Sequence, residues 1–316
     1  MIKYTFLFSL LLLTNVCLAQ EQGQQEENKQ QQESTQSTPA NVDTNNSADT
    51  ANKDTAATTS STNVVIEHPI PQTTLYQSDL KHYLPSDVIE QVMVGPDNHT
   101  SIIKPHLSAN QKGVMILLPE WQQSAMSPQA VNFLQETLPE QGWVTIAVQP
   151  LAKPPNYPST AISVTEQVEQ NKQTIENYQQ NLKGLLTAVM EKAQNYPGII
   201  VFVTQGHNAM FVGELLAAKE IPQPQALVLL SAQMSSTNAM EQSAEKLASL
   251  QLPVLDLYLR MDSPVAKQHA KIRQKHVYYL AKSQFRQKKL HNIYSGYYQG
   301  EPLIKEINGW LKSIGW

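Results

Sequence analysis

The chain has 316 residues, a formal net charge of −4 and a single cysteine. This mild acidity argues against a dedicated nucleic-acid binder, because such proteins carry an excess of Lys and Arg that neutralises phosphates. The lone cysteine excludes an intramolecular disulfide framework. The sequence contains no Cys pair, His-Glu-x-x-His run or Gly-rich phosphate loop, so we expect neither a metal site nor a cofactor.

Residues 1–19 have the features of a secretory signal peptide. Lys3 precedes an apolar run over 6–13 that is too short to span a bilayer comfortably, and Ala19 suits a cleavage site. No other segment is long and apolar enough for a membrane helix. We therefore expect a periplasmic or secreted protein whose mature chain lacks a transmembrane segment.

Cys17 raises a second interpretation, in which the segment is a lipoprotein signal. The residues before it, Thr14-Asn15-Val16, lack the Leu and the small residue that such a site resembles. Cleavage after Ala19 would remove this cysteine altogether, so the mature chain would fold without any disulfide.

Residues 20–66 are rich in Gln, Ser and Thr and contain almost no large apolar side chain. Such a segment buries too little apolar surface to offset its conformational entropy, so we predict that it is disordered. The remaining residues, 67–316, suit one α/β domain of about 250 residues.

Strand-like and helical patterns alternate through this domain. Two runs around the turn residues Gly95-Pro-Asp-Asn98 predict a hairpin. The expected strands are 88–94, 99–103, 113–118, 143–148, 199–204, 226–230, 254–259 and 285–291. The expected helices are 127–141, 164–194, one that follows residue 204 and carries Phe211 and Leu215, 239–250, 264–281 and 303–314.

Repeated strand–helix–strand units of this length predict an α/β fold. We expect a mostly parallel, twisted sheet with helices on both faces and an N-terminal antiparallel hairpin. The Pro-rich stretch 150–158, between a strand and a long polar helix, would form part of a cap over the sheet.

The segment 198–210 reads Gly-Ile-Ile-Val-Phe-Val-Thr-Gln-Gly-His-Asn-Ala-Met. It resembles a nucleophile elbow, in which the pattern Gly-x-Ser-x-Gly raises a serine on a sharp turn between strand and helix. Asn208 stands at the serine position, and Met210 replaces the second Gly. A carboxamide cannot become an oxygen nucleophile, so we expect no acyl transfer there. Because Asn tolerates positive φ, Asn208 would preserve the turn without the chemistry.

The strand order and elbow position resemble those of the α/β-hydrolase superfamily. More closely, the chain from about Tyr76 onward resembles an uncharacterised domain-of-unknown-function family (family 3530) of exported bacterial proteins with that fold. The segments that carry this resemblance are Tyr83-Leu-Pro-Ser-Asp87, Gly113-Val-Met-Ile-Leu-Leu-Pro-Glu-Trp121, Leu138-Pro-Glu-Gln-Gly-Trp143, Leu252-Pro-Val-Leu-Asp-Leu-Tyr258 and Gly309-Trp-Leu311.

The resemblance assigns roles by position. Asn208 becomes a degenerate nucleophile, Asp262 stands where the acidic triad member often lies, and His291 is the histidine nearest the last strand. In the oxyanion region the chain has Glu120, whose negative charge opposes a developing oxyanion, and Trp121, which we expect to pack under the cap.

These assignments predict an exported, catalytically inactive protein of the bacterial envelope with a binding or structural role, whose partner is an unknown small ligand or envelope component. The alternative is an active serine-type hydrolase of esters or amides with unassigned catalytic residues. Ser231, after the strand 226–230, is one serine to consider, but we expect it to cap a turn.

A third hypothesis rests on the basic segment 260–291, where Asp262 is the only acid. Such a segment could bind an anionic partner, or it could be an exposed helix and a protected edge strand. Its cations are Arg260, Lys267, Lys271, Arg273, Lys275, Lys282, Arg286, Lys288 and Lys289.

Overall fold

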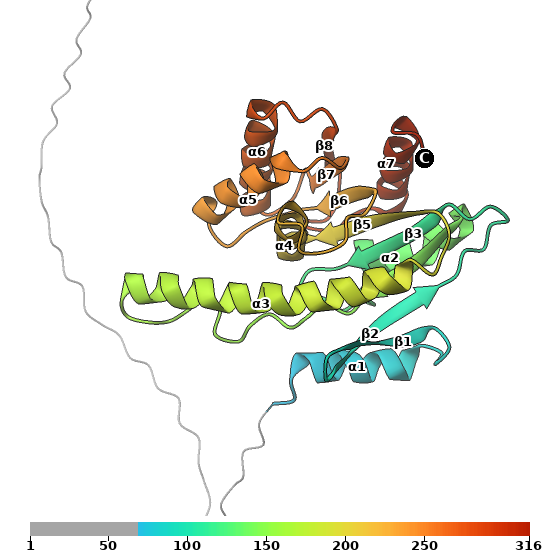
Figure 1. Cartoon of the computed structure of the whole chain (residues 1–316), viewed down its shortest axis with the longest axis horizontal. Helices are drawn as coiled ribbons and strands as arrows, with labels where there is room; N and C mark the ends of the chain where they lie inside the picture. The colour runs from blue at the N-terminus through green and yellow to red at the C-terminus, as the bar shows by residue number, and fades with distance from the viewer. Residues whose placement is uncertain (1–68) are drawn as a thin grey trace, which may run out of the picture. The chain divides into compact units, whose positions relative to one another are not determined.

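The computed structural model describes residues 69–316, so the predicted signal peptide and the predicted disordered segment lie outside the described residues. Its centre is an eight-stranded sheet with the order β1-β2-β4-β3-β5-β6-β7-β8 (Figure 1). The strands are β1 (Ile89–Val94), β2 (Asp97–Lys104), β3 (Gly113–Leu118), β4 (Trp143–Val148), β5 (Ile199–Gln205), β6 (Ala226–Leu230), β7 (Val254–Leu259) and β8 (Phe285–Leu290).

Strand β2 pairs antiparallel with both β1 and β4, and all other neighbouring strands are parallel. This arrangement confirms the predicted fold class, including the hairpin. Helices cover both faces. They are α1 (Gln72–Tyr83), α2 (Ala130–Thr137), α3 (Val164–Ala193), α4 (Gly206–Ala217), α5 (Thr237–Ser249), α6 (Pro264–Tyr279) and α7 (Gly300–Ser313).

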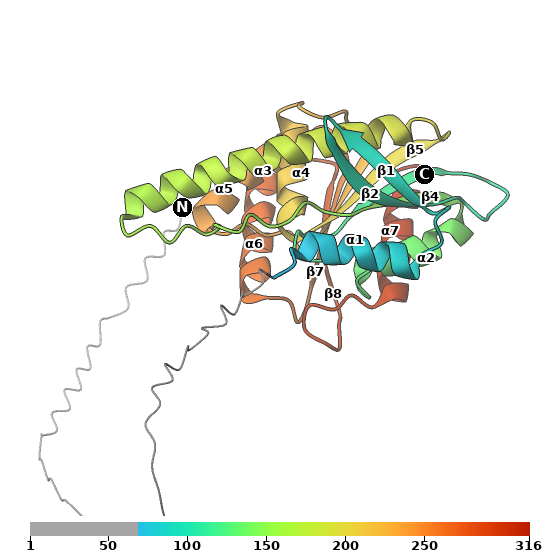
Figure 2. The same cartoon turned by 90° about the horizontal axis from the view of Figure 1, so that it is seen from below.

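The core consists of two apolar layers, one on each side of the sheet. Helices α3, α4, α5 and α6 contribute to one layer, and α1, α2 and α7 contribute to the other (Figures 1 and 2). Every residue of β3, β4 and β6 is buried, because these strands are covered on both faces. That burial explains why their sequences are nearly continuous apolar runs rather than alternating ones.

Several elements begin or end one to three residues from their predicted bounds, and two differ more strongly from the sequence-based expectation. The predicted helix 127–141 is split into α2 and a 3-10 turn, Leu138–Gln141, which ends at Gly142 with φ +90°. Helix α1 was not predicted, since Leu80 is its only buried residue and its sequence lacks an apolar face. None of the described helices is long and apolar enough to cross a membrane.

The parallel strands β3, β5, β6, β7 and β8 end at the same edge of the sheet. The predicted site residues lie directly after these strands, in the loops or first helical turns that follow them. In folds of this type, ligands and catalytic groups gather at this edge. It is therefore the place where the predicted site can be tested.

Candidate functional site

Gly206 occupies the apex between β5 and α4. The strand ends at Gln205, and Gly206 begins the helix with φ +63°. The prediction that Asn208 holds the positive-φ position is wrong, because only Gly206 has positive φ at this junction. Glycine enters that region without the steric cost of a Cβ. The apex residue of this elbow therefore has no side chain at all.

Asn208 lies in the first turn of α4 and is completely buried. Its Nδ2 donates to the carbonyl oxygen of Pro119 at 2.7 Å, and its Oδ1 accepts from the Tyr178 hydroxyl at 2.7 Å. Both ends of the amide are thus used to join α4, the loop after β3 and α3. Burial, reinforced by the negative charge of Glu120, raises the pKa of Tyr178 above its ordinary value. The hydroxyl therefore stays protonated and keeps donating to Asn208.

Glu120 fills the space beside the apex. Its Oε2 accepts the backbone N–H of His207 at 2.6 Å, and its Oε1 lies 2.9 Å from His207 Nδ1. A Cβ added to Gly206 would overlap Glu120 Oε2. In an elbow of this kind, the N–H of the residue after the apex is one donor of the oxyanion hole. Here that donor is bound to an internal carboxylate.

Trp121 packs between His207 and the aromatic side chains around it. Its ring stacks on the His207 ring with centroids 4.5 Å apart and an interplanar angle of 19°. Tyr157, Tyr178 and Phe211 contact the other sides of the indole at centroid distances of 5.7, 5.4 and 5.7 Å. Tyr157 belongs to the Pro-rich stretch, so that stretch does reach the site. Aromatic side chains therefore occupy the region above the apex.

Asp262 follows β7 and is only 8% exposed. Its Oδ2 accepts from the Ser231 hydroxyl at 2.5 Å and from the Leu259 N–H at 3.0 Å. Its Oδ1 accepts from the Ser263 N–H at 2.9 Å. The carboxylate therefore holds the turns after β6 and β7 together, and none of these donors is an imidazole.

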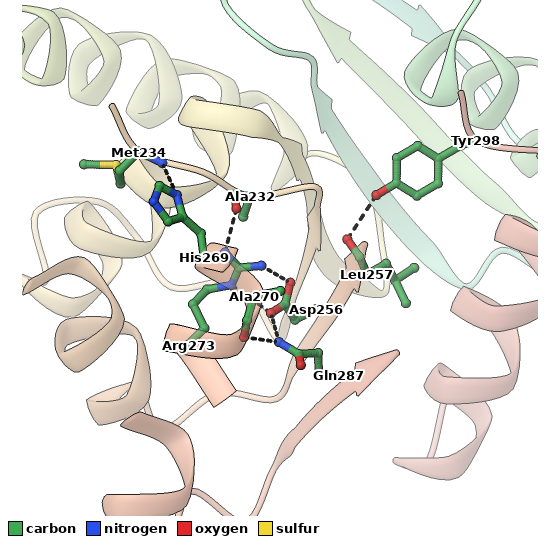
Figure 3. A network of polar contacts seen from close by, with 9 residues as sticks. All are labelled: Ala232, Met234, Asp256, Leu257, His269, Ala270, Arg273, Gln287 and Tyr298. Carbon is green, nitrogen blue, oxygen red and sulfur yellow. Dashed lines mark hydrogen bonds and ion pairs between the residues drawn. The ribbon is translucent and has the colours of Figure 1, made fainter. Parts of the chain in front are cut away.

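Ser231 differs from an ordinary turn serine in its backbone, which has φ +46°. Besides Asp262, its hydroxyl lies 2.7 Å from the Tyr298 hydroxyl. Tyr298 in turn donates to the carbonyl oxygen of Leu257 at 3.0 Å, as Figure 3 shows. Burial raises the pKa of Tyr298 well above its ordinary value. Tyr298 is therefore a neutral hydroxyl and not a base for Ser231. Ser231 and Tyr298 are 67 residues apart in the sequence, so sequence analysis could not predict their contact.

His291 comes directly after β8 and is exposed. Within residues 69–316 it forms no hydrogen bond or ion pair with another side chain or backbone group. The next residue, Asn292, is buried instead and accepts the Met261 N–H at 2.8 Å. Asn292 thus connects the loop after β8 to the loop after β7.

The described residues contain no group of three or more His, Cys, Asp or Glu side chains that could hold a metal ion. One further imidazole, that of His269, lies near enough to His207 to be affected by its charge. His269 on α6 accepts the Met234 N–H at 3.2 Å, and burial, with the charge of Arg273, lowers its pKa to about 4 (Figure 3). Its Nδ1 is therefore occupied as an acceptor.

Known structures share the fold. Est1E from Butyrivibrio proteoclasticus, with ferulic acid bound, has a TM-score of 0.53 and 11% identity, over 72% of this chain and all of that one. Thermogutta terrifontis esterase 2, phosphoramylated by tabun, has a TM-score of 0.50 and 11% identity, over 73% of this chain and 97% of that one. Identities this low establish the fold alone.

A comparison with curated proteins gave no match. A family model does match, and it spans residues 4–313, nearly the whole chain. The fold and the match agree with the family read from the sequence, but the match begins at residue 4 and not at about Tyr76. The chain belongs to the family described as "Protein of unknown function (DUF3530)", whose fold here is that of the α/β-hydrolases.

Proposed function

We propose that this protein is an exported, catalytically inactive α/β-hydrolase-like protein of the bacterial envelope, with a binding or structural role. The observation that carries the proposal is the pair formed by Gly206 and Glu120. The apex residue has no nucleophile, and the adjacent carboxylate takes the N–H of His207. Asn208, predicted from the sequence as the degenerate nucleophile, is instead a buried residue that connects α4 to Pro119 and Tyr178.

The electrostatics support this proposal. Acyl transfer requires hydrogen-bond donors aimed at the oxygen that becomes negative. Glu120 supplies a negative oxygen at that place and already uses the donor, through a charge-assisted bond of a type worth about 1.5–3 kcal/mol. A substrate oxyanion would have to displace this carboxylate and would be repelled by it.

One observation favours the alternative of an active serine hydrolase. Ser231 combines positive φ with a short hydrogen bond to Asp262, and unusual backbone geometry often accompanies function. However, its described partners are a carboxylate and a neutral Tyr298 hydroxyl, and no imidazole is among them to act as the base of a serine-hydrolase triad.

A fluorophosphonate probe separates the two proposals. We expect no labelling of the mature chain under conditions in which an active serine esterase reacts fully. Labelling that disappears in Ser231→Ala would establish the alternative. Labelling of any other serine, located by peptide mass spectrometry, would also overturn the inactive proposal.

The binding role has a candidate location beside the aromatic cluster. A groove of about 410 Å³ lies between the Pro-rich stretch and α3, with Tyr178 and Asn181 on its helical side and Leu151 and Pro154 opposite. It could take a small ligand that contacts both the cap and the helix. A ligand bound there should change the chemical shifts of Tyr178 in an NMR titration. If the ligand binds but the Tyr178 shifts do not change, the site lies elsewhere.

Export is tested on the full chain with its first residues intact. We expect the mature protein in the periplasmic or secreted fraction, with Gln20 as the first residue by mass spectrometry. A cytoplasmic protein that retains Met1, or a lipid-modified Cys17, would contradict this part of the proposal.

A further inference from the structure

Four of the cations in the basic segment 260–291 form ion pairs with acidic residues of the same chain. Arg273 is completely buried and binds both carboxylate oxygens of Asp256, at 2.8 and 2.9 Å (Figure 3). Lys275 lies 3.7 Å from Glu241. On edge strand β8, Arg286 and Lys288 both pair with Glu306 of α7.

Lys282 is also used internally. Its ammonium donates to the carbonyl oxygens of Leu250 and Leu252, and burial lowers its pKa to about 8. Each of these five cations has a partner within the fold, so none of them requires an external one. The four that remain are Arg260, Lys267, Lys271 and Lys289.

The four remaining cations all line one groove of about 520 Å³. Arg260 follows β7, Lys267 and Lys271 are one turn apart on α6, and Lys289 is near the end of β8. None of them forms an ion pair within the described part of the chain, and no acid is among the groove's lining residues. Three separate elements therefore bring unneutralised positive charge to one place.

The strand register shows why Lys289 joins this group. Lys289 pairs with Tyr258, which also lines the groove. Gln287, two residues earlier and so on the same face of β8, donates to the Ala270 carbonyl of α6 at 2.8 Å. The face of β8 with odd-numbered residues is thus turned toward α6, while Arg286 and Lys288 face α7. On the α7 face, Glu306 neutralises both of these cations. On the α6 face, the buried Asp256 beside Gln287 is already paired with Arg273.

Exposed apolar side chains adjoin the groove. Met261, Val265, Ile293, Tyr294 and Tyr297 are between 44% and 71% exposed. Met261 and Val265 are the chain neighbours of the groove residues Arg260 and Pro264.

The other three apolar residues lie on the loop after β8. This loop is bound to the loop after β7, because the Gly296 N–H donates to the Met261 carbonyl oxygen at 3.0 Å. The two loops therefore form a single surface, with apolar and aromatic groups beside a basic groove.

We propose that this face docks on an anionic phospholipid bilayer, with lipid phosphates in the basic groove and the two loops in the headgroup region. Lysine and arginine next to exposed aromatic and aliphatic groups is the pattern that binds such interfaces. A soluble phosphate compound would use the groove but would leave the apolar loops without a role. The chain as a whole has a charge of −4, so the attraction must come from this local patch.

Co-sedimentation of the mature protein with vesicles tests the proposal. We expect binding to phosphatidylcholine vesicles that contain phosphatidylglycerol, little binding to pure phosphatidylcholine, and loss of binding at high salt. Because each cation near such a surface contributes about 1 kcal/mol, Lys267→Gln with Lys271→Gln should lower the partition coefficient by roughly 25-fold. The matched control is Lys305→Gln with Lys312→Gln on α7, which makes the same charge change on exposed lysines and should change binding less than about twofold.

The apolar loops have their own matched pair. Ile293→Ser should weaken binding by roughly fivefold or more, through loss of a buried aliphatic group at the interface. Leu107→Ser removes a side chain of the same size, 72% exposed, from the loop before β3, and should have no effect.

Three results would overturn the proposal: no binding to anionic vesicles, equal losses in the α6 and α7 lysine variants, or an Ile293→Ser variant that binds like the native chain. Saturation of the groove by glycerol phosphate without vesicle binding would indicate a soluble ligand instead. Circular dichroism melts confirm that each variant is folded.

Discussion

The carboxylate of Glu120 lies so close to Gly206 that a Cβ at position 206 would overlap its Oε2. The two residues are thus complementary: the acid needs the space that the missing side chain leaves. Gly206→Ser should therefore lower the free energy of unfolding by roughly 3–5 kcal/mol, from left-handed backbone strain and a displaced charged hydrogen bond. Urea unfolding followed by circular dichroism measures this change.

A double-mutant cycle separates overlap from backbone strain. In a Glu120→Ala background, Gly206→Ser should cost about 1–2 kcal/mol, the backbone part alone. Additive losses from the two changes would show that the serine does not compete with the carboxylate.

Asn208 should be a stability residue. Asn208→Ala leaves the Tyr178 hydroxyl and the Pro119 carbonyl oxygen buried without this partner, so we expect a loss of about 2–4 kcal/mol. In a Tyr178→Phe background one of these orphaned groups is gone, so Asn208→Ala should then cost less by about 1 kcal/mol or more. An Asn208→Ala protein that melts like the native chain would contradict the bridging role.

The sheet could be predicted from the sequence because parallel strands that are buried on both faces have nearly continuous apolar sequences. Gly113–Leu118, Ala226–Leu230 and Val254–Leu259 have the same bounds in the prediction and in the structure. Helix α1 left no such signal, since only Leu80 packs into the core. Prediction from periodicity works where one side of an element is buried throughout, and α1 does not meet that condition.

The site was predictable in place but not in detail. Counting from Gly206 as the first glycine of an elbow put the apex at Asn208, yet β5 continues through Gln205 and the turn falls on Gly206. A glycine directly after a buried strand was the available signal, because glycine accepts positive φ more readily than asparagine does. The contact between Glu120 and His207 spans 87 residues, so no local pattern could reveal it.

The buried ion pair of Arg273 and Asp256 should contribute to stability only while both charges are present. Arg273→Met leaves the Asp256 carboxylate buried without its counter-charge, and we expect a loss of about 3–5 kcal/mol in chemical denaturation. Lys271→Met, an exposed change on the same helix, should alter stability by less than about 0.5 kcal/mol. Arg273→Met with Asp256→Leu should recover part of the loss, and a double variant less stable than Arg273→Met alone would contradict this account.

His269 should make stability depend on pH. Its side chain is 2% exposed, and burial, with the nearby charges of Arg273 and His207, lowers its pKa from 6.5 to about 4. A lowered pKa means that the folded chain favours the neutral ring, so this stabilisation is complete above pH 6.5 and is lost as the pH falls from 6.5 through 4.

His269→Asn keeps an acceptor for the Met234 N–H, because an amide oxygen can replace Nδ1, but it cannot be protonated in this range. Carboxyl groups titrate in the same window in both proteins, so the quantity to measure is the difference in melting temperature between native chain and variant at each pH. The native chain should lose stability relative to His269→Asn as the pH is lowered from 7 to 4. A difference that stays constant with pH would mean that the imidazole is solvated or already charged in the fold.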